Sequence, residues 1–202
     1  MSQIRHYPIA PKAVENSCEN NRPKLRPILQ TQKQPKLKQA SAFVKTALGT
    51  FLAHYSERGL VALDFPGNKP AKRTIRAPTK LLSPQLRCWH RLTTRALQRA
   101  LTGKPVFRLP PFDWSAATPF QRKVWCALQK IPPGVTTTYG LVAAAIGHPQ
   151  AARAVGRACA ANPIPILVPC HRVLPASKQL GGFAAGPRWK KLLLLREDVV
   201  FV

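Results

Sequence analysis

The sequence feature with the clearest chemical use is a cysteine followed directly by a histidine. Cys170 and His171 stand in the tetrad Pro-Cys-His-Arg, after the apolar run of residues 166–168. The thiolate is the reactive form of cysteine, and a neighbouring imidazole can take the thiol proton directly or through a water molecule. Because the surroundings are rich in arginine, we expect an accessible thiolate at the end of a short strand. The adjacent pair alone is weak evidence, since it also arises by chance.

The cysteines as a group do not form a recognisable framework. The chain has five of them: Cys18, Cys88, Cys126, Cys159 and Cys170. An odd number at irregular spacing argues against a set of structural disulfides. No pair has the Cys-x2-Cys spacing of a structural zinc site, and Cys88 with His90 offers only two ligands. Cys126 and Cys159 lie in apolar helical patterns, where a cysteine usually packs as a small core residue.

The charge of the chain points to a polyanionic partner. The 202 residues include 32 Lys and Arg against 7 Asp and Glu, a net charge of +25, and the excess extends over the whole length. Nucleic acid is the commonest partner of such a chain. The alternative explanation of the charge is an organism whose proteins are basic in general. No apolar run approaches the roughly 20 residues of a membrane span. The N-terminus lacks the apolar core of a secretory signal, so we expect a cytoplasmic protein.

The elements that position the Cys-His pair follow from the local pattern. Residues 1–40 contain five prolines and no periodicity, which predicts a disordered basic tail. Residues 41–112 predict a small α+β domain with its linker: three short strands, with turns at Gly49 and residues 56–59, and then a helix from Ser83 to Gly103. Residues 113–202 predict a second domain that contains the Cys-His pair.

The second domain is predicted to be mostly helical. Thr118 has the surroundings of a capping box that opens one helix. A short helix closed by Gly147 and an alanine-rich helix over residues 150–161 have the spacing of a helix-turn-helix. Arg153 and Arg157 share one face of the second helix, and the small side chains around them would let its backbone approach a partner closely. An ordinary alanine-rich packing helix is the alternative.

From about Thr118 to Glu197 the sequence resembles the O6-alkylguanine-DNA alkyltransferases, also called methylated-DNA–protein-cysteine methyltransferases. The matching segments, in the family's order and spacing, are FQRKVWCALQKIPPGVTTTYG, AARAVGRACAANP, ILVPCHRV, LGGFAAG and KKLLLLRE. The predicted strands also resemble the family's N-terminal domain. The resemblance implies an α+β protein, in which a small RNase H-like sheet domain precedes a mostly helical, winged helix-turn-helix-like domain.

The resemblance also implies the catalytic residues. Cys170 matches the alkyl acceptor, and His171 matches the base that takes the thiol proton through a bridging water molecule. Glu197 matches the carboxylate that holds this histidine and stabilises its protonated form, as in hydrolase triads. Asn162 matches the residue whose hydrogen bonds shape the turn before the active-site strand.

Further residues match positions that bind the substrate base. Tyr139 matches a hydroxyl that hydrogen-bonds the guanine ring and helps to neutralise the leaving purine. The backbones of Val173 and Ala184 match groups that hold the base edges. Phe183 occupies a place that the family often fills with tyrosine, and packing over the base requires only an aromatic ring.

The alanine-rich helix matches a recognition helix in the minor groove of DNA. Arg153 matches the side chain that enters the base stack and replaces a flipped nucleotide. Ala152 and Gly156 keep the helix thin enough for the groove, and Arg157 stands where the family commonly has a smaller or neutral residue and adds a phosphate contact.

The activity implied is DNA repair by direct reversal. An alkyl group, chiefly methyl, passes from O6 of guanine, and also from O4 of thymine, to Cys170 once per protein molecule. The partner is double-stranded DNA that contains alkylated guanine, the protein is a monomer, and the displacement needs no cofactor and no metal. Two alternatives remain: a lesion-recognising DNA-binding protein without transfer, and a transcription regulator. Relatives of the first kind have a different residue at the cysteine position, and no metal-binding cysteine cluster supports the second.

Overall fold

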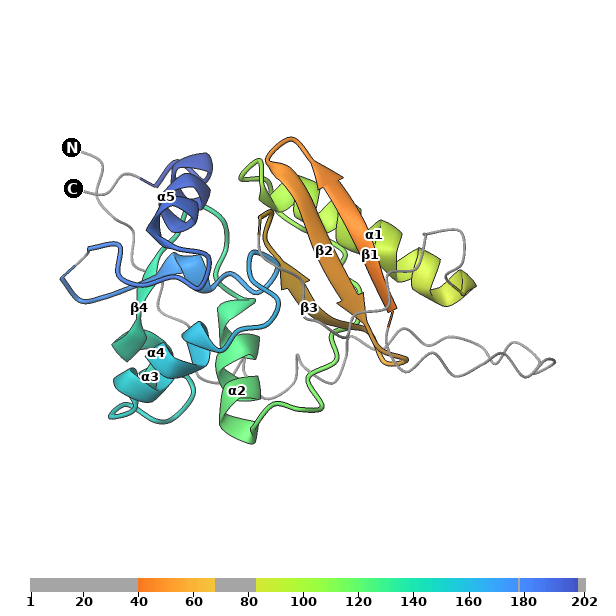
Figure 1. Ribbon diagram of the computed structural model, residues 1–202. Coiled ribbons are helices and arrows are strands. Elements are labelled where there is room, and N and C mark those ends of the chain that lie inside the picture. The colour runs from red at the N-terminus through yellow and green to blue at the C-terminus, as the bar shows by residue number, and fades with distance from the viewer. Residues whose placement is uncertain (1–39, 68–82, 178, 200–202) are drawn as a thin grey trace.

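The fold combines a three-stranded sheet with a mostly helical half that contains the Cys-His pair (Figure 1). The computed structural model describes residues 40–67, 83–177 and 179–199. The disordered tail predicted for residues 1–40 lies outside these residues, except for Ala40. No helix in the described part of the chain has both the length and the apolar character needed to cross a membrane.

Three antiparallel strands form the sheet, in the order β1-β2-β3, as the pattern predicted. Their bounds are β1 (Ala40–Thr46), β2 (Gly49–Tyr55) and β3 (Leu60–Asp64). Helix α1 (Pro84–Ala100) lies against β1 and β2 (Figure 1). Apolar and small side chains fill the face of α1 that meets the sheet, among them Trp89, Ala96 and Leu97. This packing gives the sheet one covered face.

A local capping signal starts helix α1 where the sequence predicts. The Ser83 side chain accepts a hydrogen bond from the Leu86 backbone at 3.3 Å and caps α1. The connection after α1 turns at Gly103, whose φ is +69°. A Cβ atom there would overlap the Arg196 carbonyl oxygen, so only glycine allows this close approach to the end of the last helix.

The described residues of the second half form four α-helices and a short parallel sheet. The helices are α2 (Pro119–Leu128), α3 (Tyr139–Ala145), α4 (Ala152–Ala160) and α5 (Pro187–Arg196). Strands β4 (Thr137–Thr138) and β5 (Val173–Leu174) pair in parallel. Thr118 and Gln121 form the predicted capping box of α2. The Trp125 indole donates a hydrogen bond to the Ala158 carbonyl at 2.9 Å and joins α2 to α4.

The prediction of a strand at residues 166–168 is wrong. Ile166 has a φ of +73°, and this left-handed conformation breaks an extended run. A left-handed backbone is costly for a β-branched residue, and the neighbouring hydrogen bonds hold it in place. The chain then enters a single 3-10 turn, η3 (Cys170–Arg172), before β5. Cys170 therefore begins a short helical turn instead of ending a strand.

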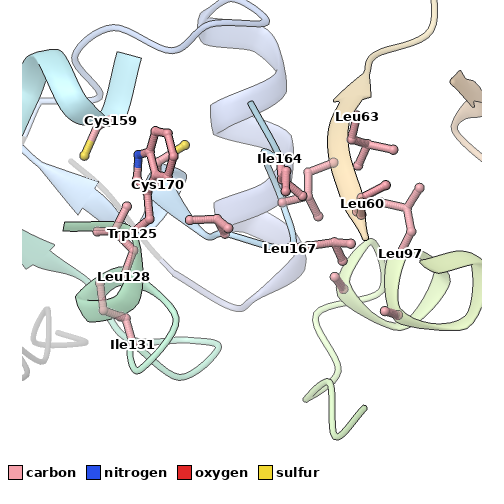
Figure 2. Close-up of a cluster of buried hydrophobic side chains, with 14 of the residues drawn as sticks. Leu60, Leu63, Leu97, Trp125, Leu128, Ile131, Cys159, Ile164, Leu167 and Cys170 are labelled. Carbon is pink, nitrogen blue, oxygen red and sulfur yellow. The ribbon is translucent and has the colours of Figure 1, made fainter. Parts of the chain in front are cut away.

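One apolar core extends from the sheet into the helical half. In Figure 2, Leu60, Leu63 and Leu97 lie on one side and Trp125, Leu128 and Cys170 on the other, with Ile164 and Leu167 between them. The Leu63 amide also donates a hydrogen bond to the Pro163 carbonyl at 2.9 Å. The sheet thus packs directly against the segment that leads to Cys170. The domain boundary at residue 112 stays a prediction.

Candidate functional site

Asn162 positions the Cys170 sulfur. The Asn162 amide nitrogen donates hydrogen bonds to Cys170 Sγ at 3.2 Å and to the Val168 carbonyl at 2.8 Å. Its side-chain oxygen accepts from the Ile164 amide at 3.0 Å. A single buried side chain therefore closes the turn of residues 162–168 and contacts the sulfur at the end of it.

The prediction of an accessible thiolate at Cys170 is wrong. Cys170 is 6% exposed, and burial raises the pKa of its thiol. The hydrogen bond from Asn162 and the nearby charge of Lys190 oppose this rise without reversing it. The resting sulfur is therefore a neutral thiol, which needs a base before it can act as a nucleophile.

His171, the next residue in the chain, is the candidate for that base. Its Nε2 lies 3.0 Å from Glu197 Oε1, and both side chains are almost fully buried. An ionised carboxylate only accepts hydrogen bonds, so Nε2 carries the proton and Nδ1 carries the free lone pair. Nδ1 has no hydrogen-bond partner among the described residues. Burial lowers the pKa of His171 despite the opposing effect of Glu197, so the ring is neutral at pH 7.

Arg172 holds the Glu197 carboxylate, a role that was not predicted from the sequence. Its guanidinium donates to both carboxylate oxygens, at 2.8 to 3.2 Å, and to the Ile131 carbonyl. Burial by itself raises the pKa of Glu197, but hydrogen bonds from His171 and Arg172 outweigh it and lower the pKa to about 2. Two features of the sequence could have indicated this role: Arg172 stands within an apolar stretch, and the chain has only seven acids that could pair with it.

Lys190 is a second functional candidate that the sequence reasoning missed. This lysine in α5 is completely buried, and its Nζ donates to the Val173 carbonyl at 2.8 Å. Burial lowers the pKa of Lys190 to about 8, while the thiols of Cys170 and Cys159 oppose the shift. The signal in the sequence was its helical spacing to Leu193 and Leu194, which places the lysine on the buried face.

Four of the predicted contact residues line one pocket. The pocket has a volume of about 410 Å³, and its lining includes Tyr139, Ala152, Arg153 and Gly156. Tyr139 lies against Gly156, where a Cβ atom would be 3.9 Å from the phenol ring. Burial, with smaller effects of Cys159 and Cys170, raises the pKa of Tyr139 to about 12, so its hydroxyl stays protonated and can donate.

The other predicted contact residues do not line this pocket. Phe183 packs edge-on against His171, with ring centroids 6.5 Å apart, and also against Phe65. Val173 is fully buried in β5, whereas Ala184 and Arg157 are exposed. No group of three or more His, Cys, Asp or Glu side chains in the described ranges could hold a metal ion.

The comparisons with known proteins identify the family of this chain. Residues 119–199 match the family model of the 6-O-methylguanine DNA methyltransferase, DNA binding domain. A methylated-DNA–protein-cysteine methyltransferase of Methanosarcina acetivorans is 38% identical over 159 residues, which cover 77% of this chain and 96% of the relative. The chain belongs to the methylated-DNA–protein-cysteine methyltransferase family. The resemblance inferred from the PCHRV segment is confirmed, and with it DNA repair by alkyl transfer to a protein cysteine.

Further relatives of this methyltransferase support the same assignment. The Salmonella typhimurium methylated-DNA–protein-cysteine methyltransferase is 53% identical over 88 residues, which cover 44% of this chain and 52% of the relative. A crystal structure of Mycobacterium tuberculosis OGT in complex with DNA superposes with a TM-score of 0.65 at 31% identity, and the match covers 80% of this chain and 94% of that one. The mixed α/β fold is therefore that of a family member, and DNA is its partner.

Proposed function

We propose that the protein transfers an alkyl group, chiefly methyl, from O6 of guanine in duplex DNA to Cys170. The observation that carries this proposal is the hydrogen bond of His171 Nε2 to Glu197, which leaves Nδ1 of the residue that follows Cys170 without a partner among the described residues. O4-alkylthymine is the second substrate that we propose. The product is a thioether, which is chemically stable, so each molecule reacts once.

The reaction is a displacement at the alkyl carbon. His171 Nδ1 takes the Cys170 proton through a bridging water molecule, and the sulfur attacks the carbon bonded to O6. The carbon–sulfur bond forms as the carbon–oxygen bond breaks, and the electron pair passes to the purine. The buried Glu197 stabilises the imidazolium that results.

Tyr139 and its neighbours bind the leaving base. The Tyr139 hydroxyl, kept protonated by its raised pKa, donates a hydrogen bond to the purine as negative charge develops there. Phe183 packs over the base, and the backbones of Val173 and Ala184 hold its edges. Asn162 keeps the sulfur aligned with the alkyl carbon, as its 3.2 Å contact with Sγ supports.

Helices α3 and α4 form the DNA-reading part of a winged helix-turn-helix. Ala152 and Gly156 let α4 approach the floor of the minor groove, Arg157 contacts a phosphate, and Arg153 fills the place of the flipped nucleotide. The sheet half corresponds to an RNase H-like domain. We further propose that the protein acts as a monomer in the cytoplasm.

A duplex with a radiolabelled methyl group on guanine O6 tests the acceptor. Label becomes bound to the protein at one equivalent or less, and mass spectrometry finds the added CH2 mass on the peptide that contains Cys170. Cys170→Ala accepts no label, whereas Cys159→Ala, which removes another buried thiol, keeps the transfer. Equal labelling of wild type and Cys170→Ala would refute the acceptor. Binding of the duplex without transfer by wild type would favour the lesion-recognising alternative.

Arg153 is tested by comparing duplex and free substrates. Only the duplex reaction requires extrusion of the base, so Arg153→Ala slows repair of the duplex much more than the reaction with free O6-benzylguanine. Arg153 is an exposed residue of α4, so the substitution leaves the buried face of that helix unchanged. Equal losses on the two substrates would contradict the role in base flipping.

A further inference from the structure

Helix α1 carries a row of arginines that the proposed reaction does not use. Arg87, Arg91, Arg95 and Arg99 follow one another at intervals of four residues, and all four are exposed. The helix contains no Asp or Glu. One side of this 17-residue helix, in the sheet half of the molecule, therefore carries only positive charge.

The row faces away from the sheet. Residues four apart lie one above the other on a helix, about 6 Å apart along the axis. The buried residues Trp89, Thr93, Ala96 and Ala100 mark the face of α1 that contacts the sheet. At 100° per residue, the arginines centre on the opposite side of the helix.

Folding alone does not account for this arrangement. Like charges at intervals of four destabilise a helix, and acidic residues among them would relieve the repulsion. The basic surface also continues past the helix, where Lys104 and Arg108 are exposed. A partner with closely spaced negative charges removes the repulsion between neighbouring arginines such as Arg91 and Arg95.

The side-chain type favours phosphate as that partner. The guanidinium of arginine is a planar fork that binds phosphate oxygens through two hydrogen bonds, and a DNA strand presents such groups at regular short intervals. DNA is already the partner of this family. We propose that the exposed face of α1 binds the phosphate backbone of a second DNA segment, separate from the one that α3 and α4 contact.

The placement of α1 allows two segments to be held at the same time. In Figure 1, α1 lies at one end of the molecule, behind the sheet, whereas α3 and α4 lie at the other end. A duplex along α1 and a duplex against α4 therefore occupy different sides of the protein. This surface extends the function beyond alkyl transfer, because it lets the protein bridge or step between neighbouring DNA segments.

The test measures bridging with the full chain. Two short undamaged duplexes, one carrying a donor dye and the other an acceptor, are mixed with the protein at low salt, and energy transfer reports their approach. The test variant is Arg91→Gln with Arg95→Gln. Arg99 is left intact because its Nε donates to the Pro105 carbonyl. The matched control, Lys45→Gln with Arg58→Gln, removes two exposed charges elsewhere in the sheet half.

We expect wild type and control to bring the duplexes together and the α1 variant to lose most of the energy transfer. Loss of two phosphate contacts also reduces the slope of log binding constant against log salt by about 2. Arg91→Lys with Arg95→Lys keeps the charge and retains most of the bridging. The rate with free O6-benzylguanine is the same in all four proteins, because no residue near Cys170 has changed.

Equal bridging by the α1 variant and the control would overturn the proposal. So would a variant that loses binding to polyglutamate but not to DNA, because the row would then serve an acidic protein. Failure of every protein, wild type included, to react with benzylguanine would contradict the proposed alkyl transfer and leave the bridging result standing.

Discussion

Cys170, the proposed alkyl acceptor, is a buried thiol surrounded by groups that favour its ionised form only partly. Burial raises the pKa of Cys170, while Asn162 and the charge of Lys190 lower it. In the proposed reaction, the thiolate therefore forms when His171 takes the proton, and not as a stable resting state. A buried thiol is also shielded from oxidants and stray electrophiles, which suits a residue that reacts once.

Lys190→Met tests the electrostatic part of this arrangement. The variant removes the positive charge, so the pKa of Cys170 rises further and the reaction with free O6-benzylguanine slows at pH 7. Each unit of pKa costs about tenfold in rate. The pH–rate profile of the variant moves to higher pH.

Two neighbouring substitutions serve as controls. Lys190→Arg keeps the charge and recovers part of the rate, and Lys191→Met, at an exposed position of the same helix, changes neither the rate nor the profile. An unshifted pH profile in Lys190→Met would restrict Lys190 to a structural role, through its hydrogen bond to the Val173 carbonyl.

One face of helix α4 packs against the neighbouring helices, and another face carries small side chains. Val155, Ala158 and Cys159 are buried against the neighbouring helices, and the Ala158 carbonyl accepts the hydrogen bond of Trp125. Ala152 and Gly156 line the pocket instead. At Gly156, the Tyr139 ring is the nearest group that an added Cβ atom would meet.

Substitutions at Gly156 test two properties separately: the stability of helix α4 and the space available in the pocket. A Cβ atom would be 3.9 Å from Tyr139, an ordinary contact, so Gly156→Ala folds and gains about 0.5 to 1 kcal/mol of stability from its better helix propensity. Gly156→Phe fills the pocket and slows alkyl transfer from both duplex and free base. Thermal unfolding and single-turnover rates measure the two effects.

The matched control is Ala160→Phe, at an exposed position of the same helix that does not line the pocket. It keeps the rate with the free base. If Gly156→Phe reacted with the free base as fast as wild type does, the pocket would not be the place where the base binds.

The whole molecule is organised around contacts between the sheet half and the site. Phe65 of the sheet half packs on Trp189 of α5, with centroids 4.8 Å apart, and on Phe183, which in turn packs on His171. Glu197, just after α5, accepts hydrogen bonds from His171, from Arg172 and from the Gly134 amide. These contacts make the site part of the core, so that the stability of the fold and the order of the site depend on the same groups.

Acid should therefore unfold the protein through Glu197 and His171. The pKa of Glu197 is lowered from 4.5 to about 2, so its contribution to stability is complete above pH 4.5 and is lost as the pH falls toward 2. The lowered pKa of His171 adds to the loss below pH 6.5, because the unfolded chain binds a proton more readily than the buried ring does. Urea unfolding at a series of pH values measures this decline.

Glu197→Gln tests how much the Glu197 carboxylate contributes to the pH dependence of stability. It leaves Arg172 buried without its counter-charge, which costs about 3 to 5 kcal/mol at pH 7. The variant then loses less stability than wild type between pH 4.5 and pH 2. Parallel declines in the two proteins would contradict the linkage to Glu197.

Local features of this protein were predictable because they depend on residues close together in the chain. The caps at Ser83 and Thr118 and the three strands occur where the pattern placed them. A cap needs only a hydrogen bond to a residue three positions away, and a strand needs only alternation. The family followed from the PCHRV segment and its neighbours for a similar reason, since the reaction requires those residue types at that spacing.

The sequence by itself determined the nucleophile candidate, its histidine and the helices around them. Tertiary structure alone decided that Cys170 is buried with a raised pKa, that Arg172 and Lys190 belong to the site, and that residues 166–168 turn instead of extending. Burial and ion pairing depend on which distant segments meet. Arg172 and Glu197 are 25 positions apart, and no short-range pattern encodes the enclosure that sets the charge of each group.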